Sequence, residues 1–250
     1  MLILGGTADA NRLAAALADD PNIDAVLSYA GRTQNPLPPA IAWRVGGFGG
    51  VTGLADYLRA ENIDRVVDAT HPFAAQMSAN AIAACETAGV PLLALERAPW
   101  PRLPGDRWIK VDDVMAAAEA LGREARRVFL GIGRQHLRAF AAYPQHVYLV
   151  RLVDPPRDPL PLPHAEVIVA RGPFERAGDR AMLENFAADI VVARNAGGNA
   201  ASAKIEAARD LALPVVMIRR PFIPERKTVE TVAEVLSWLG HDHASAERGV

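Results

Sequence analysis

The feature that most constrains the fold is an alternation of short apolar runs with helical stretches along nearly the whole chain. Strands that alternate with helices in this way pair in parallel through right-handed crossovers, so helices cover both faces of the sheet. We therefore predict an α/β protein with two doubly wound parallel sheets of the Rossmann or flavodoxin-like type. The expected strands are 2–4, 25–29, 43–45, 65–69 and 92–95 in the first half, and 128–130, 147–150, 167–170, 190–193 and 215–218 in the second.

A proline-rich segment, 98–105, separates the two halves, because so many prolines can continue neither a helix nor a strand. The expected parts are an N-terminal domain (1–98), a hinge (99–107), a C-terminal domain (108–240) and a polar tail (241–250), with a cleft between the domains. Residues 90–100 also match residues 213–222 weakly. Gene duplication and the shared composition of βα units explain this match equally well.

Composition excludes several classes of function. A formal charge of −2 does not favour a nucleic-acid-binding protein. The single cysteine, Cys85, rules out a disulfide framework, and no cluster of Cys and His has metal-ligand spacing, so we expect no metal. No basic leader or long apolar span precedes the first strand, which predicts a cytoplasmic protein that does not enter the membrane.

The first two turns favour a dinucleotide. Gly5, Gly6 and Thr7 follow an apolar run and open a helix, where backbone N–H groups and the helix dipole attract phosphate. This turn lacks the complete G-x-G-x-x-G pattern and is also common as a plain connection. Arg32 and Thr33 follow the second expected strand, where an NAD enzyme needs an acidic residue for the ribose. Arg32 there favours a 2′-phosphate and hence NADP, although a solvated loop arginine explains it equally well when taken alone.

Two further turns lie at the ends of expected strands. The run Gly46, Gly47, Phe48, Gly49 and Gly50 is entropically costly unless the backbone turns tightly or closely approaches a ligand. In the run 68–73, Pro72 suits a first helical position, and Thr70 or His71 could cap that helix. His71 could also donate a proton near neutral pH, although a capping or packed histidine is the commoner case.

Several of these segments resemble the precorrin-6A reductase family of cobalamin biosynthesis, a family of NADPH-dependent enzymes. The resemblance covers nearly the whole chain, and its most specific parts are the Gly46–Gly50 run and the Asp68–Ala74 run. Ala196 stands where serine is usual in the family, so we do not expect it to be catalytic. The segments are 2–7, 30–33, 44–50, 68–74, 172–174, 195–198 and 204–208.

The resemblance implies that NADPH reduces one double bond of a tetrapyrrole, converting precorrin-6A to precorrin-6B. We expect the glycine turns, Thr7, Arg32, Thr33 and Thr70 to bind NADPH. His71 is the expected proton donor, with water or the acidic macrocycle as alternatives. The residues expected to bind substrate carboxylates are Arg134, Arg194, Asn195 and Lys204.

Three other functions stay open on the sequence. One is a two-lobed small-molecule binding protein without catalysis. Another is an NADP-dependent sugar or short-chain reductase, although the chain lacks the usual Tyr-x-x-x-Lys pair. The third is a cobalt-precorrin-6A reductase, which takes a cobalt-bound substrate in place of a metal-free one. The oligomeric state is also left open.

Overall fold

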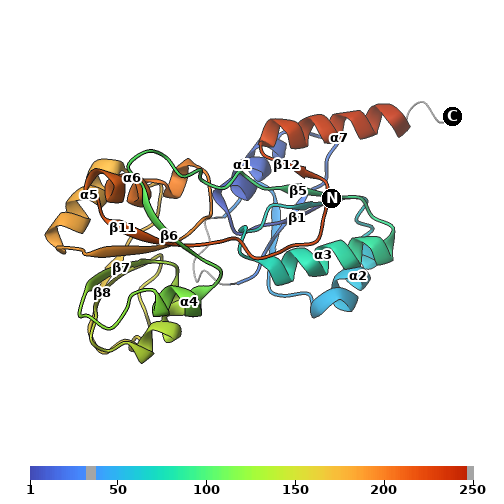
Figure 1. Cartoon of the computed structure of the whole chain (residues 1–250). Helices are drawn as coiled ribbons and strands as arrows, with labels where there is room; N and C mark the ends of the chain where they lie inside the picture. The colour runs from blue at the N-terminus through green and yellow to red at the C-terminus, as the bar shows by residue number, and fades with distance from the viewer. Residues whose placement is uncertain (32–37, 247–250) are drawn as a thin grey trace. The chain divides into compact units, whose positions relative to one another are not determined.

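The computed structural model describes residues 1–31 and 38–246 and divides the chain into two compact units (Figure 1). The first unit contains Met1–Ala98 and the residues from Phe222 onward, and the second contains Pro99–Pro221. Each unit has a six-stranded sheet whose strand pairs are all parallel, with helices between the strands in sequence. This architecture confirms the predicted α/β fold.

The sheet of the first unit is built around its first strand. The strand order is β12-β5-β4-β1-β2-β3, and Leu2 of β1 aligns with Val26 on one side and Val66 on the other. The central strand therefore carries apolar residues only, as a buried parallel strand requires. The strands are β1 (Leu2–Leu4), β2 (Val26–Tyr29), β3 (Ala42–Val45), β4 (Val66–Asp68), β5 (Leu92–Leu95) and β12 (Thr228–Val229).

Helices cover both faces of this sheet. Ile3 points to the face where α1 (Ala8–Leu17) and α7 (Val232–Ala246) pack, in a core that includes Val235. Leu2 and Leu4 point to the other face, where α2 (Gly50–Ala60) and α3 (Ala75–Ala88) pack. Because side chains alternate between the two faces along this short strand, its residues pack into two separate cores.

The second unit repeats this arrangement. Its strand order is β6-β11-β10-β7-β8-β9, so β7 holds the central place that β1 holds in the first sheet. Helices α5 and α6 cover one face over Phe129 and Val191, and α4 lies on the other side of the sheet (Figure 1). The elements are β6 (Arg107–Val111), β7 (Arg127–Gly131), β8 (Val147–Leu152), β9 (Ala165–Val169), β10 (Ile190–Arg194), β11 (Pro214–Ile218), α4 (Val114–Glu119), α5 (Arg176–Asn185), α6 (Ala203–Asp210) and the 3₁₀ helices η1 (Arg134–Ala142) and η2 (Asn199–Ala201).

Two of the expected domain boundaries differ from this division. Residues 222–240, expected in the C-terminal domain (108–240), belong to the first unit, because β12 pairs with β5 and α7 buries Val235 and Leu239 in the first core. The expected hinge, 99–107, is part of the second unit, and β6 begins at its last residue and pairs with β11. A hydrophobic pattern predicts a strand or a helix but does not say which sheet it joins. In the described part of the chain, no helix is both long and apolar enough to cross a membrane.

Replacing Gly53 of α2 by alanine should destabilise the first unit. A Cβ at this position would lie 1.8 Å from the carbonyl oxygen of Phe48, so the loop before the helix would have to move. We expect a loss of about 3 kcal/mol in the free energy of unfolding, measured by urea denaturation. Gly178→Ala in α5 is the control, because its Cβ would meet nothing within 4 Å and alanine favours a helix. Equal effects of the two substitutions would contradict this prediction.

Acid should destabilise the second unit through His146. This side chain is fully buried against the Tyr143 and Tyr148 rings, and burial lowers its pKa because the charged form loses its hydration. The unfolded chain therefore takes up a proton near the ordinary pKa, about 6.5, while the native state does not. The stability that the neutral ring contributes is complete above that pH and falls as the pH drops toward the native pKa.

Urea denaturation between pH 7.5 and pH 5 measures this effect. We expect the free energy of unfolding to fall by up to about 1.4 kcal/mol per pH unit on account of this one group. His146→Phe should have a shallower pH dependence, because it removes the proton uptake and keeps an aromatic ring. An unchanged slope in that variant would show that other groups cause the acid lability.

Candidate functional site

The candidate cofactor site lies at the carboxyl edge of the first sheet. The chain runs from β1 to β2 and β3 on one side and returns to β4 and β5 on the other, so the turns after β1 and β4 flank a topological switch point. Open α/β sheets bind ligands at such points. The hydroxyl of Thr7 donates to the carbonyl oxygen of Ala69 at 2.8 Å and so ties the two turns together. Two motifs 62 residues apart in sequence thus meet at one place.

The turn after β1 is shaped by its two glycines and Thr7. A Cβ on Gly5 would lie 2.6 Å from Cδ1 of Leu27, so Gly5 is needed for packing against β2. Gly6 has a φ of 115°, and its missing Cβ would point into open space. Thr7 caps α1 by accepting a hydrogen bond from the Ala10 N–H at 3.1 Å. The turn leads directly into the positive end of a helix dipole, a favourable place for phosphate.

The glycine loop after β3 forms an open backbone surface. Gly46, Gly49 and Gly50 have positive φ angles of 127°, 82° and 85°. A Cβ at Gly47, Gly49 or Gly50 would meet nothing within 4 Å. These glycines allow the positive φ angles of the loop and leave open space beside its backbone. Both properties agree with the predicted close approach of the loop to a ligand.

Arg44 holds this loop in place. Its guanidinium donates to the Ser28 hydroxyl at 2.8 Å and to the Gly46 carbonyl at 3.1 Å, and it lies 4.1 Å from the centre of the Phe48 ring. Phe48 in turn packs edge-on against Tyr57 of α2. Phe48 is half-buried, and its contacts with Arg44 and Tyr57 help to hold the loop. Nothing in the local sequence pattern predicts this role for Arg44, although Arg44 begins one of the family-like segments.

Arg32, expected at the 2′-phosphate, and Thr33, expected to bind the same cofactor, lie outside the described residues. Gly31, just before them, has a φ of 74°, and a Cβ there would lie 3.2 Å from Val45 at the end of β3. The binding of a 2′-phosphate by Arg32 therefore stays a prediction from the sequence.

Beneath the turn after β4 lies a buried carboxylate, Asp68. Its Oδ1 accepts hydrogen bonds from the Thr70 N–H at 3.1 Å and from the Thr70 hydroxyl at 2.7 Å. Its Oδ2 accepts from the Ser78 hydroxyl at 2.6 Å and lies 3.8 Å from Nη2 of Arg226, which also binds Glu96 at 2.8 Å. The sequence pattern does not predict this cluster, because nothing local brings Arg226 to β4.

His71 follows Thr70 on the same turn. Its Nδ1 accepts a hydrogen bond from the Phe73 N–H at 3.1 Å, so the neutral ring carries its proton on Nε2. The expected capping role is wrong: α3 begins at Ala75 with Ala74 as its cap, and neither Thr70 nor His71 caps it. His71 is half-buried.

The second sheet places two of the predicted basic side chains at its own switch point. Arg134 begins η1 after β7, and Arg194 ends β10 beside β7, the place that β4 holds in the first sheet. Nη1 of Arg194 lies 3.3 Å from Nε2 of His136, and Nη2 of Arg134 lies 3.3 Å from the exposed carboxylate of Asp158. Both cations thus lie at the carboxyl edge of this sheet.

Asn195 and Lys204 have structural contacts at the same edge. The Asn195 amide accepts from the Trp100 N–H at 2.7 Å and donates to the Trp100 carbonyl at 3.0 Å, which fixes the backbone of the 99–107 segment. Lys204 is buried, donates to the Ala201 carbonyl at 2.5 Å and lies 5.1 Å from the Trp100 ring. A Cβ on Gly131 would lie 3.0 Å from Cδ of Lys204, so Gly131 leaves room for this lysine.

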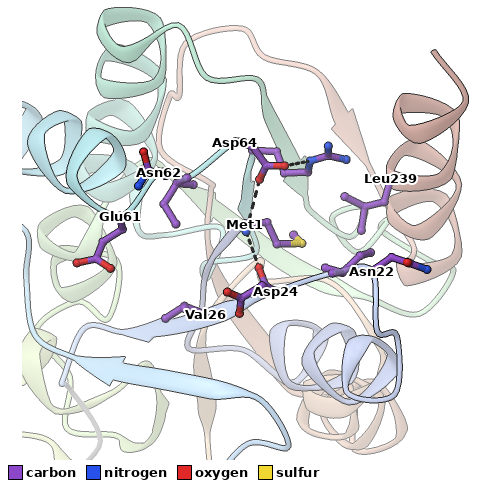
Figure 2. Close-up of a pocket in the computed structure, with 11 residues that line it drawn as sticks. Met1, Asn22, Asp24, Val26, Glu61, Asn62, Asp64 and Leu239 are labelled. Carbon is purple, nitrogen blue, oxygen red and sulfur yellow. Dashed lines mark hydrogen bonds and ion pairs between the residues drawn. The ribbon is translucent and has the colours of Figure 1, made fainter. Parts of the chain in front are cut away.

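A pocket of about 370 Å³ lies at the opposite, amino edge of the first sheet (Figure 2). Its walls include Met1, Asp24 and Asp64; the Met1 amino group donates to the Asp24 carbonyl at 2.6 Å and lies 3.5 Å from Asp64. No glycine lines this pocket. Since ligands of open α/β sheets bind at the carboxyl edge, we do not place the cofactor here. Among the described residues there is no group of His, Cys, Asp and Glu that could hold a metal ion.

Comparison with known proteins gives consistent matches. The precorrin-6x reductase CbiJ/CobK family matches residues 1–240. A precorrin-6A reductase of Rhodobacter capsulatus is 56% identical, over all of this chain and 99% of the relative. A solved structure titled CobK precorrin-6A reductase has a TM-score of 0.92 at 56% identity and covers 96% of this chain and 95% of that one. A cobalt-precorrin-6A reductase of Priestia megaterium is 30% identical, over 74% of this chain and 76% of the relative.

Replacing Thr7 by valine should destabilise the first unit by about 1–2 kcal/mol, because it removes both the helix cap and the bond to Ala69. Thr7→Ser, which keeps the hydroxyl, is the matched control and should stay close to the original protein. Urea denaturation of the two variants measures the difference. Equal stabilities would mean that the hydroxyl does not hold the two turns together.

Proposed function

Because the chain belongs to the precorrin-6x reductase family, we propose that it reduces precorrin-6A in cobalamin biosynthesis, with NADPH as the hydride donor. The observation that carries this proposal is the match to a precorrin-6A reductase at 56% identity over the whole chain. The tie between Thr7 and Ala69 supports it, since it joins two predicted cofactor motifs at the switch point of one sheet.

The alternatives are less well supported. A two-lobed binding protein without catalysis does not account for full-length similarity to reductases. The alternative with a cobalt-bound substrate is weaker because a relative named cobalt-precorrin-6A reductase is 30% identical over 74% of the chain, against 56% over all of it for a precorrin-6A reductase. We therefore favour metal-free precorrin-6A as the substrate.

The carboxyl edge of the first sheet fits a dinucleotide. Gly6, Gly47, Gly49 and Gly50 each leave open space where a Cβ would stand, so a phosphate can approach the backbone. We assign phosphate binding to Gly5–Thr7 and Gly46–Gly50, and the 2′-phosphate to Arg32 and Thr33. Thr70 is assigned to the same cofactor. Bound NADPH supplies the hydride, and the protein supplies position and electrostatics.

His71 is proposed to supply the proton that accompanies the hydride. Its Nδ1 is engaged by the Phe73 N–H, which makes Nε2 the ring atom proposed to carry and donate the proton. Reduction of a double bond adds one hydride and one proton. NADPH would supply the hydride, and His71 would supply the proton.

The substrate is a ring edged with carboxylates, and we assign these to the carboxyl edge of the second sheet. Arg194 and Arg134 are the proposed direct contacts, because guanidinium groups bind carboxylates in a bidentate manner. Asn195 and Lys204 remain in the proposed set, and their bonds to Trp100 and Ala201 indicate that they also hold the turn that presents Arg194.

The first test is an anaerobic assay of the purified protein with precorrin-6A, following the loss of NADPH absorbance, together with tryptophan-quenching titrations of NADPH and NADH. We expect turnover with NADPH, and a strong preference for NADPH that Arg32→Ala weakens by about 10–100-fold in Kd. Arg59→Ala, at an exposed site on α2, is the control. Absence of turnover would contradict the proposed reaction, and equal binding of both cofactors would contradict the role of Arg32.

The second test concerns His71. If it donates the proton, His71→Ala should lower kcat by about 10²–10⁴-fold and leave the Kd for NADPH nearly unchanged. Stopped-flow measurement of NADPH oxidation separates this step from product release. Turnover at the original rate would remove His71 from the mechanism and leave water or the macrocycle as the proton source.

A further inference from the structure

The buried carboxylate of Asp68 has no assigned role in the reaction, although it is bonded to the turn that bears His71. Its side chain is 1% exposed and its two oxygens are used by four groups: the N–H and hydroxyl of Thr70, the hydroxyl of Ser78 and, at 3.8 Å, Arg226. Burying a charged carboxylate is costly, and only such a complete set of partners offsets the lost hydration.

The fold itself does not require this charge. In the second sheet, β10 holds the place of β4 beside the central strand, and its residues from Ile190 to Ala193 are apolar and fully buried. An apolar residue at the position of Asp68 would therefore serve a parallel sheet of this order equally well. What distinguishes β4 is the turn that follows it, with Thr70 and His71.

The bonds of Asp68 act on that turn. Two of them go to Thr70, one through its backbone N–H and one through its hydroxyl, so the carboxylate fixes the backbone one residue before His71. The bond to Ser78 joins the same carboxylate to α3, the helix that follows the turn. Asp68 thus connects the end of a rigid strand, the turn and the first part of a helix.

Arg226 supplies the balancing charge from a distant part of the chain. Its side chain is 9% exposed, and it lies between the carboxylates of Asp68 and Glu96. Among the described residues, the Nε of Arg226 is buried without a hydrogen-bond partner. The main contribution of Arg226 is therefore its positive charge beside the two carboxylates. It precedes β12, the strand that the C-terminal segment adds beside β5.

We propose that Asp68 is a positioning residue for the reaction: through Thr70 it fixes the turn that presents His71, and Arg226 lies beside its carboxylate as the balancing charge. This inference rests on the proposed function of the site. Neither residue needs to touch substrate or cofactor. A displacement of about 1 Å in a reacting group can lower a rate by about 10²-fold, so positioning of this kind has a large expected effect.

The test is a double-mutant cycle between Asp68→Asn and His71→Ala in the full-length protein, measured as kcat with precorrin-6A and NADPH. We expect Asp68→Asn alone to lower kcat by about 10–100-fold, with little change in the KM for either substrate. In the His71→Ala background it should cause no further loss, because there is no longer a group to position. Asp56→Asn, an exposed carboxylate on α2, is the matched control and should leave kcat unchanged.

Multiplicative losses would overturn the inference, since they would mean that Asp68 acts on stability in general. An unchanged kcat in His71→Ala would also overturn it, because the turn would then present no catalytic group. If Asp68→Asn does not fold, Ser78→Ala removes one bond to the same carboxylate and should give the same pattern with a smaller loss.

Arg226→Met tests the charge balance. It should lower the thermal midpoint, because it removes the cation that lies between the buried carboxylate of Asp68 and the partly buried carboxylate of Glu96, and adding Asp68→Asn should raise the midpoint again. A further drop in the double variant would contradict the assigned role of Arg226.

Hydrogen exchange of the amides in residues 69–74 gives a readout without activity. Exchange should become faster in Asp68→Asn and stay the same in Asp56→Asn. If the original protein does not reduce precorrin-6A, the proposed function fails, and this exchange measurement alone decides whether Asp68 orders the turn. Unchanged exchange would overturn the inference.

Discussion

The rest of the first unit depends on one constraint: the central strand β1 is paired in parallel on both sides and covered by helices on both faces. Leu2, Ile3 and Leu4 are consequently all buried, and none of them can carry chemistry. Polar groups are displaced to the carboxyl edge, where the strands end and the backbone turns. The same constraint holds for β7 in the second unit, so both units place their candidate site residues at the equivalent edge.

The glycines of the first unit serve two structural purposes, close packing and the shape of an open loop. Gly5 is required by the close approach of Leu27, and Gly53 by the carbonyl of Phe48, so both serve the fold. Gly6, Gly49 and Gly50 have positive φ angles and open space beside them, so they shape the surface at the edge. Arg44 links these functions, because it supports the loop through Ser28, Gly46 and the Phe48 ring.

The Asp68 cluster illustrates why buried charge is retained in a core that could be apolar. Asp68, Arg226 and Glu96 come from β4, the C-terminal segment and the end of β5. A carboxylate held by directed hydrogen bonds fixes a geometry that a non-directional apolar contact cannot fix. This cluster is bonded to Thr70 on the turn that carries His71, and positioning that turn is the role that we propose for it.

The sequence is enough to predict the alternation of strands and helices, the α/β class and the turns that follow β1, β3 and β4, because these features depend on local periodicity and on glycine. It also identifies the family, through segments such as 44–50 and 68–74. Three features are visible in the three-dimensional structure alone: residues 222–240 belong to the first unit, Thr7 bonds to Ala69, and Arg226 lies beside Asp68. These contacts join residues far apart in the chain, and a local pattern carries no information about which distant surface will bury it.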